Sequence, residues 1–374
     1  MLAFENMKIA QVAPLWESVP PKLYGGTERI VSYLTEELVR QGHDVTLFAS
    51  GDSVTDASLR PVCRQALRLR GRGLMDPLAQ HVRMIEMVAK EARRFDVIHF
   101  HTDYLHFPLT RRQSVPTLTT LHGRLDIPDL VPLFREFDEM NLVSISDVQR
   151  RPIPWANWLA TVHHGIPLHM YQAHSEPGAY LAFLGRICPE KGVDRAIEIA
   201  TRAQIPLRIA AKIDAADREY FECKIRGLLD NPLVEFVGEI ADHQKSGFLG
   251  NARALLFPID WPEPFGLVMI EAMACGTPVI AFARGSVPEI VDEGVTGYLV
   301  NTMEEAVDAV HRADAIDRLV CRRVSEERFG VERMCQDYLD VYARLSGEQR
   351  EPMPSAKSEL AASARQAPNI DETL

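Results

Sequence analysis

Short β-type runs alternate with longer helical ones along the first half of the chain. Between the β-type runs, residues 26–42 and 77–95 repeat apolar positions every three or four residues, which places them on one face of a helix. Strands that alternate with such helices are typical of βαβ units, so we predict a parallel sheet with crossover helices. The strands are expected at 8–15, 44–50, 96–101, 115–122 and 142–147.

The second half of the chain repeats this pattern from residue 179 onward. The segment 169–178 between the two series is polar and contains Pro and Gly, which favours a hinge. We therefore predict two doubly wound α/β domains, followed by a last helix at 331–345 and a polar tail, 347–374, that is expected to be disordered. The second-half strands are expected at 179–186, 206–213, 234–240, 252–259 and 278–284, with helices at 192–203 and 265–276.

Length and composition fit a two-domain enzyme. The chain has 374 residues, 46% hydrophobic and 25% charged, which is ordinary for a globular protein. Acidic and basic residues balance within 1–170, so the net charge of -11 lies entirely in 171–374. Because a duplex-binding protein would show a broad basic footprint, nucleic acid is not an expected partner.

The cysteines and the apolar runs suggest a cytosolic location. The six cysteines are widely spaced, and none forms a C-x-x-C pair that could chelate zinc or cycle as a dithiol. No apolar run reaches the roughly 20 residues needed to span a bilayer, and the N-terminus lacks a signal-type apolar stretch. We expect a cytoplasmic protein, with peripheral contact at the inner membrane face left open.

The segment P-E-P-F-G-L-V-M-I-E-A-M-A-C-G at 262–276 carries the strongest chemical signal. As a helix over 265–275, it would place Glu271 on one face with Leu267 and Ala274. A carboxylate among apolar residues costs roughly several kcal/mol unless partners satisfy it. A ribose diol would do so, since two hydroxyls can donate to one carboxylate. A backbone amide or a basic side chain of the protein is the alternative partner.

The start of this helix and a second motif both suggest a phosphate site. The first amides of a helix have no intrahelical partner, so the N–H groups at Phe265, Gly266 and Leu267 would suit phosphate oxygens. Arg186 and Lys191, in L-G-R-I-C-P-E-K-G, directly follow a predicted strand, at the edge where α/β sheets bind ligands. Two cations suit a departing diphosphate. Ordinary surface charges on a turn are the alternative interpretation.

The segment Y-G-G-T-E-R at 24–29 opens the first predicted helix with Gly25 and Gly26, a turn that tolerates an anion. It is not G-x-G-x-x-G, and the absence of that fingerprint from the sequence argues against a nicotinamide enzyme. No G-x-S-x-G or Walker loop occurs either. The long loop before these glycines contains Trp16 and is a candidate wall of an acceptor pocket; an ordinary loop is the alternative.

The histidines raise the question of a metal. His99, His101 and His106 lie close in sequence, but alternate residues of a parallel strand usually pack against helices, and no H-E-x-x-H helix accompanies them. We therefore predict no metal site. His122 ends a predicted strand just before Gly123, and we expect it to point into the cleft.

An arginine-rich run extends from Arg60 to Arg72, with five arginines and no acidic residue. It is a candidate for weak contact with an anionic acceptor or an acidic membrane surface. The interpretation we favour is a solvated helix face or loop.

In this order, these motifs resemble the family-4 retaining glycosyltransferases of the GT-B fold. The resemblance covers roughly residues 8–346 and is densest at 181–300. No single motif is specific, but their combination is. The motifs are G-G-x-x-R at 25–29, T-x-H-G at 120–123, G-R-x-x-x-x-K-G at 185–192, E-x7-E from Glu263 to Glu271, G-T-P-V-I-A at 276–281, V-P-E-I-V at 287–291 and G-V-T-G-Y-L-V at 294–300.

The resemblance implies two Rossmann-like domains that face each other across a cleft. Residues 1–168 would form the acceptor-side domain, and 178–332 would bind the nucleotide sugar. The last helix, 333–346, would cross back onto the N-terminal domain. The implied reaction moves a hexose from a UDP- or GDP-linked donor to a sugar, lipid or small-molecule hydroxyl, with retention of configuration and without a metal or other cofactor.

The resemblance also implies roles for particular residues. Arg186 and Lys191 would hold the diphosphate, and Glu271 would accept from the ribose hydroxyls. The full donor-binding set would be Gly25, Gly26, Arg186, Lys191, Glu263, Phe265, Gly266, Leu267 and Glu271. The catalytic set would be His122, Glu263, Arg186 and Lys191, and the acceptor side would include Trp16, Tyr24 and Arg124.

Two departures from the family pattern and two rival functions remain open. Ala210 and Ala211 stand where relatives often have glycine near the base pocket, with Lys212 directly after them, so the nucleobase is not assigned. His164, in V-H-H-G-I-P, replaces the more usual Asn and is expected to alter the interdomain geometry. The rivals are a sugar-nucleotide epimerase on the same architecture and a non-catalytic nucleotide-sugar-binding protein. The oligomeric state is open.

Overall fold

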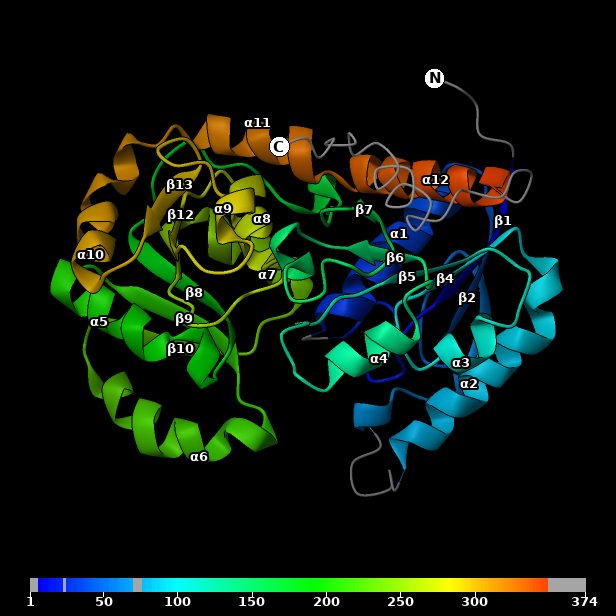
Figure 1. The fold of residues 1–374 in the computed structure, drawn as a ribbon. Coiled ribbons are helices and arrows are strands. Elements are labelled where there is room, and N and C mark those ends of the chain that lie inside the picture. Colours follow the sequence, from blue (N-terminus) through cyan, green and yellow to red (C-terminus); the bar gives the residue numbers. More distant parts are fainter. Residues whose placement is uncertain (1–5, 23–24, 70–75, 349–374) are drawn as a thin grey trace, which may run out of the picture.

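The computed structural model describes residues 6–22, 25–69 and 76–348. It contains two parallel sheets with helices packed around them, side by side along the molecule (Figure 1). This arrangement confirms the predicted fold class of two doubly wound α/β domains. The first sheet is built from residues between Lys8 and Thr161, and the second from residues between Tyr180 and Val300.

The first sheet has the strand order β3-β2-β1-β4-β5-β6-β7, and all of its strands are parallel. In its centre, Gln11 of β1 lies opposite Leu47 of β2 and His99 of β4. The strands are β1 Lys8–Val12, β2 Asp44–Ser50, β3 Ser58–Cys63, β4 Val97–Phe100, β5 Thr117–Thr120, β6 Leu142–Ser144 and β7 Trp158–Thr161.

The second sheet has the order β10-β9-β8-β11-β12-β13 and is also parallel throughout. Its central strand β8 ends at Arg186, next to Lys212 at the end of β9. The strands are β8 Tyr180–Arg186, β9 Leu207–Lys212, β10 Val234–Gly238, β11 Ala252–Phe257, β12 Val279–Phe282 and β13 Gly297–Val300.

Helices connect most successive strands, as the predicted crossover pattern requires, whereas a loop at 51–57 joins β2 to β3. Those of the first half are α1 Gly26–Arg40, α2 Pro77–Glu91, α3 Phe107–Thr110 and α4 Leu130–Glu136. Those of the second half are α5 Val193–Ala203, α6 Arg218–Tyr220, α7 Asp242–Gly250, α8 Leu267–Ala274, α9 Val287–Ile290, α10 Met303–Arg312, α11 Arg318–Phe329 and α12 Val331–Glu348.

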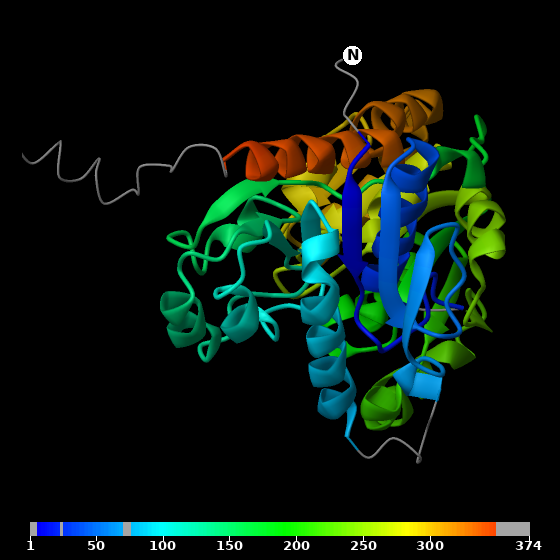
Figure 2. The same cartoon turned by 90° about the vertical axis from the view of Figure 1, so that its right-hand side faces the viewer.

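The helix α12 packs on the first half of the molecule although it follows the second half in sequence. It contacts α1 and β4, and Figure 2 shows it lying across the upper end of β1 and α1. Its side chains Tyr338 and Tyr342 are fully buried. At its start, the backbone bridges Ile166 to Gly330, an approach so close that a Cβ on Gly165 would lie 2.4 Å from the Gly330 oxygen.

The largest apolar core crosses the boundary between the two sheets. It joins Ile9 and Val143 beside the first sheet to Leu255 and Val279 of the second. Phe265 and Phe329 belong to this core, and their rings form a T-shaped pair with centroids 6.2 Å apart. The two halves are therefore packed against each other and not merely linked by residues 169–178.

Three predictions need correction at the level of single elements. The favoured helix or loop at 60–72 is wrong for its first residues, because Arg60 lies in the edge strand β3. The helix predicted over 265–275 begins at Leu267, after Gly266 has turned the backbone to φ +86°. Residues 347 and 348 belong to α12 and not to a tail. The rest of the predicted tail, 349–374, lies outside the described residues.

No helix within residues 6–22, 25–69 and 76–348 is long and apolar enough to cross a membrane.

Candidate functional site

A cavity of about 410 Å³ lies where the carboxyl ends of the two sheets face each other. From the first half it is lined by the start of α1 and by His122, Ile145 and His164. From the second half it is lined by the ends of β8 and β9, the start of α8 and the segment 261–266. In doubly wound folds, ligands bind outside the carboxyl ends of the strands, so this cavity is the candidate functional site.

Two of the cations at the end of the second sheet are already paired with carboxylates. Arg186 at the end of β8 has its Nη1 3.8 Å from Asp214 and its Nε 3.3 Å from Asp217. The Nζ of Lys212, at the end of β9, lies 3.0 Å from Asp214. A bound anion would therefore share these cations with the acids of the loop that follows β9.

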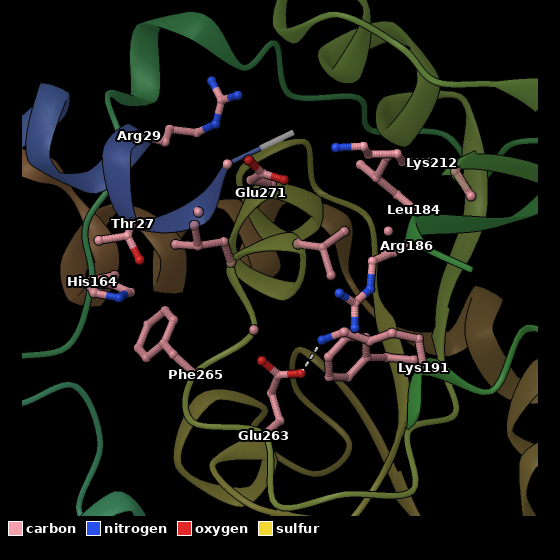
Figure 3. Close-up of a pocket in the computed structure, with 18 of the residues that line it drawn as sticks. Thr27, Arg29, His164, Leu184, Arg186, Lys191, Lys212, Glu263, Phe265 and Glu271 are labelled. Atoms are coloured by element: carbon pink, nitrogen blue, oxygen red, sulfur yellow. Dashed lines mark hydrogen bonds and ion pairs between the residues drawn. The ribbon is translucent and has the colours of Figure 1, made fainter. Parts of the chain in front are cut away.

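Lys191 is a third cation that lines the cavity, and it also pairs with a carboxylate. Its ammonium pairs with Glu263 and lies 5.0 Å from the centre of the Trp261 ring. The Trp261 Nε1 donates to the same Glu263 oxygen at 3.0 Å. Figure 3 shows Arg186 and Lys191 extending toward each other on the side of the cavity opposite His164 and Phe265. This arrangement concentrates positive charge where a diphosphate could lie.

The start of α8 turns its backbone amides toward the same cavity. Gly266 is the N-cap, and no side chain caps the helix. The N–H groups of Leu267 and Val268 therefore have no intrahelical partner, while that of Met269 donates to the Gly266 oxygen at 3.0 Å. Gly266, Leu267 and Val268 all line the cavity. A Cβ on Gly26, the first residue of α1, would lie 3.8 Å from Leu267 Cδ1. Two helix N-termini, one from each half, thus meet at the cavity and favour an anion there.

Glu271 lies one helical turn further into α8 and is almost completely buried, with 2% of its surface exposed. Its Oε1 accepts from Lys245 Nζ at 2.7 Å and from the Tyr171 hydroxyl at 3.1 Å. Among the described residues, none donates to its Oε2. Burial raises the pKa of Glu271, but Lys245 and the nearby Arg29 outweigh this effect and hold the pKa below its ordinary value. The carboxylate is therefore charged, with one oxygen held by the protein.

A charged contact joins the two halves beside Glu271. Arg29 of α1 pairs with Asp242 at the start of α7, and Asp242 also lies 3.1 Å from Lys245. Arg29 is buried, with 3% of its surface exposed, and both it and Lys245 line the cavity. These ion pairs connect α1 of the first half to α7 of the second half, next to Glu271, the residue predicted to bind the ribose.

Both ring nitrogens of each of His99, His101 and His106 are engaged in hydrogen bonds. The partners of His99 are Tyr342 and Thr120, those of His101 are His122 and Gln11, and those of His106 are Thr110 and Thr119. Burial lowers the pKa of His106 and of His122 to about 3, so both rings are neutral near pH 7. His122 lines the cavity, and its ring stacks on that of His164 with centroids 5.3 Å apart.

A second cavity of about 420 Å³ adjoins the first on the N-terminal side. The two share Gly25, Gly26, Thr27 and His122 as lining residues. The second cavity is also lined by Trp16, Leu78, His81, Asp103 and Leu105. Two ligands in these cavities would therefore meet at the α1 start and His122.

The structure gathers most of the predicted site residues into one place. Trp16 lines the second cavity. Arg124 lines neither described cavity and instead forms ion pairs with Asp126 at 2.6 and 2.7 Å. Tyr24 lies outside the described residues. The residues that line the first cavity are Gly25, Gly26, His122, Arg186, Lys191, Glu263, Phe265, Gly266, Leu267 and Glu271; their individual roles stay predictions.

Three residues that lie around Glu271 were not predicted from the sequence. Lys245 and Arg29 supply its positive surroundings, and Tyr171 donates a hydrogen bond to it from the predicted hinge. Arg29 ends the G-G-x-x-R motif, which is a signal that could have identified it. Lys245 sits in a segment with no motif and Tyr171 in one interpreted as a polar linker, so neither gave a comparable signal.

Two family models match the chain, one in each half. The model described as "Glycosyltransferase Family 4" matches residues 24–159, and that described as "Glycosyl transferases group 1" matches residues 171–329. Among similar proteins, the phosphatidyl-myo-inositol mannosyltransferase of Mycobacterium leprae (strain TN) is 25% identical over 358 residues, which cover 86% of this chain and 90% of the relative.

Solved structures show the same architecture. Sucrose-phosphate synthase from Thermosynechococcus elongatus matches with a TM-score of 0.73 and 21% identity, over 91% of this chain and 99% of that one. HepE from Anabaena, solved in complex with UDP and glucose, matches with a TM-score of 0.72 and 17% identity, over 90% and 100%. At these identities the structures establish the fold, while the family models cover both halves. The chain therefore belongs to the family-4 glycosyltransferases of the GT-B fold.

Proposed function

We propose that this protein transfers a hexose from a UDP- or GDP-linked donor to an acceptor hydroxyl, with retention of configuration. The observation that carries the proposal is the composition of the first cavity. There, Arg186, Lys191 and the uncapped start of α8 surround one region, and the charged Glu271 lies a helical turn away. A nucleotide diphosphate offers the complementary groups, since its phosphates need cations and amides while its ribose hydroxyls need an acceptor.

The donor would be held with its diphosphate between Arg186, Lys191 and the α8 amides. Arg186 can fork onto two phosphate oxygens, and Lys191 adds a point charge. These groups would also stabilise the charge that develops as the diphosphate leaves. The Glu271 Oε2, which accepts from no described residue, would receive the ribose hydroxyls. The UDP bound in HepE is consistent with such a donor in this fold.

The acceptor would enter through the second cavity. Because the two cavities share His122 and the start of α1, an acceptor hydroxyl and the sugar carbon would come together there. Trp16 and Leu78 line this cavity while 38% and 53% of their surfaces are exposed. Such exposed apolar groups suit a sugar ring face or the apolar part of a lipid or small molecule.

Retention and metal independence are parts of the proposal with separate tests. A same-face reaction, in which the leaving phosphate helps to deprotonate the acceptor, would require positioning and charge stabilisation and no protein nucleophile. NMR coupling constants of the product's anomeric proton would report the configuration. Activity that survives EDTA would support metal independence, and loss that Mg²⁺ or Mn²⁺ restores would contradict it.

The two rival functions make different predictions. An epimerase would return an isomerised donor sugar with no transfer to any acceptor. A non-catalytic binding protein would show donor binding without turnover, even with many acceptors supplied. One cavity is lined by two carboxylates, Glu263 and Glu271, and by two cations, Arg186 and Lys191. A site that only binds the donor would not need cations placed to stabilise a leaving group. Their presence therefore favours a catalytic protein.

The first experiment is a thermal-shift screen of UDP, GDP and other nucleoside diphosphates. A ligand at 100 times its Kd should stabilise the protein by about 2.7 kcal/mol. The variant Arg186→Ala should lose turnover while its melting temperature stays near that of the wild type, because its ion pairs are partly solvent-exposed. Arg208→Ala is a matched control, since Arg208 pairs with Glu235 at 2.8 Å outside the cavity. Equal activity of the two variants would refute the phosphate assignment.

Location and membrane contact stay predictions. Two of the arginines in 60–72 are engaged, since Arg60 lies 3.4 Å from Glu91 and Arg68 lies 3.1 Å from Glu17. Arg70 and Arg72 lie outside the described residues. A weak contact with an anionic surface would show as salt-sensitive binding to vesicles that contain phosphatidylserine, and its absence would leave the run a solvated edge.

A further inference from the structure

Buried hydrogen bonds connect His122 at the cavity to helix α12. The connection begins at His122 Nε2, which lies 2.9 Å from His101 Nδ1. It continues from His101 Nε2 to Gln11 Oε1 at 2.8 Å, and from Gln11 Nε2 to the Tyr342 hydroxyl at 3.0 Å. Gln11 of β1 lies opposite His99 of β4, and both side chains contact Tyr342 of α12, while His101 directly follows β4 and reaches α12 through Gln11.

The Gln11 side chain determines the direction of these bonds. Its Nε2 donates to Tyr342, so its Oε1 faces His101, and a carbonyl oxygen can only accept. His101 must therefore carry its proton on Nε2. Burial lowers the pKa of His101 well below its ordinary value, so the ring is neutral and its Nδ1 holds a lone pair. That lone pair must accept from His122 Nε2–H.

The same argument assigns the protons of His122. With its proton on Nε2 and its ring neutral, the other nitrogen, Nδ1, holds a lone pair. This Nδ1 is buried and has no hydrogen-bond partner among the described residues. If each hydrogen bond between Tyr342 and His122 had the opposite direction, His122 Nδ1 would be a buried N–H without an acceptor. Buried donors without a partner are rarer in proteins than acceptors without one. The direction set by Gln11 therefore also has the lower free-energy cost at His122.

Helix α12 holds the other end of the connection. After accepting from Gln11, the Tyr342 hydroxyl has one proton to give, and His99 Nδ1 lies 2.7 Å away. His99 Nε2 then donates to Thr120 Oγ1 at 2.7 Å. Tyr338, one turn before Tyr342, lies 3.0 Å from the same Thr120 oxygen. A hydroxyl oxygen has two lone pairs, so the Thr120 oxygen can accept from both His99 and Tyr338. The Tyr338 bond therefore does not determine the direction of the other hydrogen bonds.

We propose that Tyr342, Gln11 and His101 are positioning residues that fix His122 as the Nε2–H tautomer, which leaves its Nδ1 as a hydrogen-bond acceptor. The use of this acceptor during the reaction rests on the proposed function. The tautomer itself does not, because it is a property of the protein without ligand. A helix from the end of the chain thus sets the hydrogen-bonding character of a side chain that lines both cavities.

The direct test is 15N NMR of the histidine rings in the full-length protein near neutral pH, with the His122 signals assigned by their loss in His122→Asn. The expected result is a pyrrole-type Nε2 and a pyridine-type Nδ1. The reverse pattern in the wild type would overturn the proposal without any variant. Failure to bind nucleotide sugars would refute the proposed function and leave this result untouched.

Two tyrosine variants provide a matched pair on one helix. In Tyr342→Phe, the Gln11 amide loses its acceptor and can rotate, so the His122 signals should shift toward a mixture of both tautomers. In Tyr338→Phe, an equally buried hydroxyl is removed from the same helix, and the His122 signals should stay those of the wild type. Unchanged His122 signals in Tyr342→Phe would contradict the assigned role of α12.

Gln11→Met offers a second route if Tyr342→Phe does not fold, because it removes the bond to His101 directly and should give the same tautomer mixture. In folded variants, kcat/KM for transfer should fall in proportion to the fraction of His122 that leaves the Nε2–H tautomer, about two-fold for an equal mixture, while the nucleotide Kd stays unchanged. A fall in nucleotide affinity of the same size would indicate general damage to the site and would contradict a role confined to His122.

Discussion

Replacing Glu271 with glutamine tests the donor assignment most sharply, because the change keeps the side-chain shape and removes the charge. In the native protein, Oε1 is held by Lys245 at 2.7 Å and by Tyr171 at 3.1 Å, and Oε2 accepts from no described residue. After the change, Lys245 keeps Asp242 as a partner at 3.1 Å. The variant should therefore fold, and its effect should fall mainly on the ligand.

The expected magnitude follows from the charge on the acceptor. A hydroxyl that donates to a carboxylate contributes about 1.5–3 kcal/mol, or roughly 10- to 150-fold in affinity, against about 0.5–1.5 kcal/mol for a neutral acceptor. The wild type should thus bind the preferred nucleotide diphosphate much more tightly than its 2′-deoxy or 3′-deoxy analogue. In Glu271→Gln this preference should shrink to about 10-fold or less.

Isothermal titration calorimetry of the wild type and of Glu271→Gln, each with the ribose and the deoxy nucleotides, forms a double-mutant cycle. The cycle gives the coupling free energy between the Glu271 charge and the ribose hydroxyl. Glu235→Gln is the matched control, since it removes a carboxylate that pairs with Arg208 outside the cavity. It should leave the ribose preference intact. If Glu271→Gln kept the full preference of the wild type, the ribose would lie elsewhere, and the buried carboxylate would serve only to hold Lys245 and Tyr171.

Three further predictions follow from the same geometry. Gly266→Ala should weaken binding of the nucleotide diphosphate by titration and lower the urea midpoint, because φ is +86° and a Cβ would lie 2.7 Å from a neighbouring methyl group. Lys245→Met should cost about 3–5 kcal/mol in urea unfolding by leaving the buried Glu271 charge without its nearest cation. It should also raise the Glu271 pKa, so that nucleotide affinity increases with pH. Burial lowers the pKa of His106 and of His122 to about 3. Between that value and the ordinary pKa of about 6.5, these two histidines are protonated in the unfolded chain and neutral in the native state. The free energy of unfolding should fall by about 1.4 kcal/mol per histidine for each pH unit below about 6.5, and a stability that is flat from about pH 7 to 5 would contradict this.

The central strands of both sheets were predictable because both of their faces are covered. In β1 and β4, for example, nearly every residue is buried, so the sequence there is mostly apolar, and its polar members Gln11 and His99 are enclosed. The strands missed were β3, β7 and β13, and each forms an edge of its sheet. β3 contains Arg60 and Pro61, which an edge tolerates since one side of the strand needs no hydrogen-bonding partner.

The site divides along similar lines. Arg186, Lys191 and Glu271 belong to local motifs whose spacing already implies a sheet edge or a helix face. Lys245 and Tyr171 reach Glu271 only because α7, the segment after residue 168 and α8 pack together, and nothing in their own neighbourhoods indicates this. The start of α8 was predicted at 265, two residues too early, because local sequence did not indicate the conformation there either. Helix propensity alone does not reveal that Gly266 adopts a positive φ.

The course of α12 determines how this enzyme can be divided or recombined. Residues 1–168 alone would expose α1 and the histidine face of the first sheet, because their cover is supplied by a helix that comes after residue 330. A fragment or a chimera with a relative should therefore keep α12 from the same parent as the N-terminal half. An exchange of the C-terminal half cut only within residues 169–178 would instead bring in a foreign helix and replace Tyr338 and Tyr342. Exchanges with two cuts, near residues 170 and 330, should give soluble protein where single-cut exchanges aggregate.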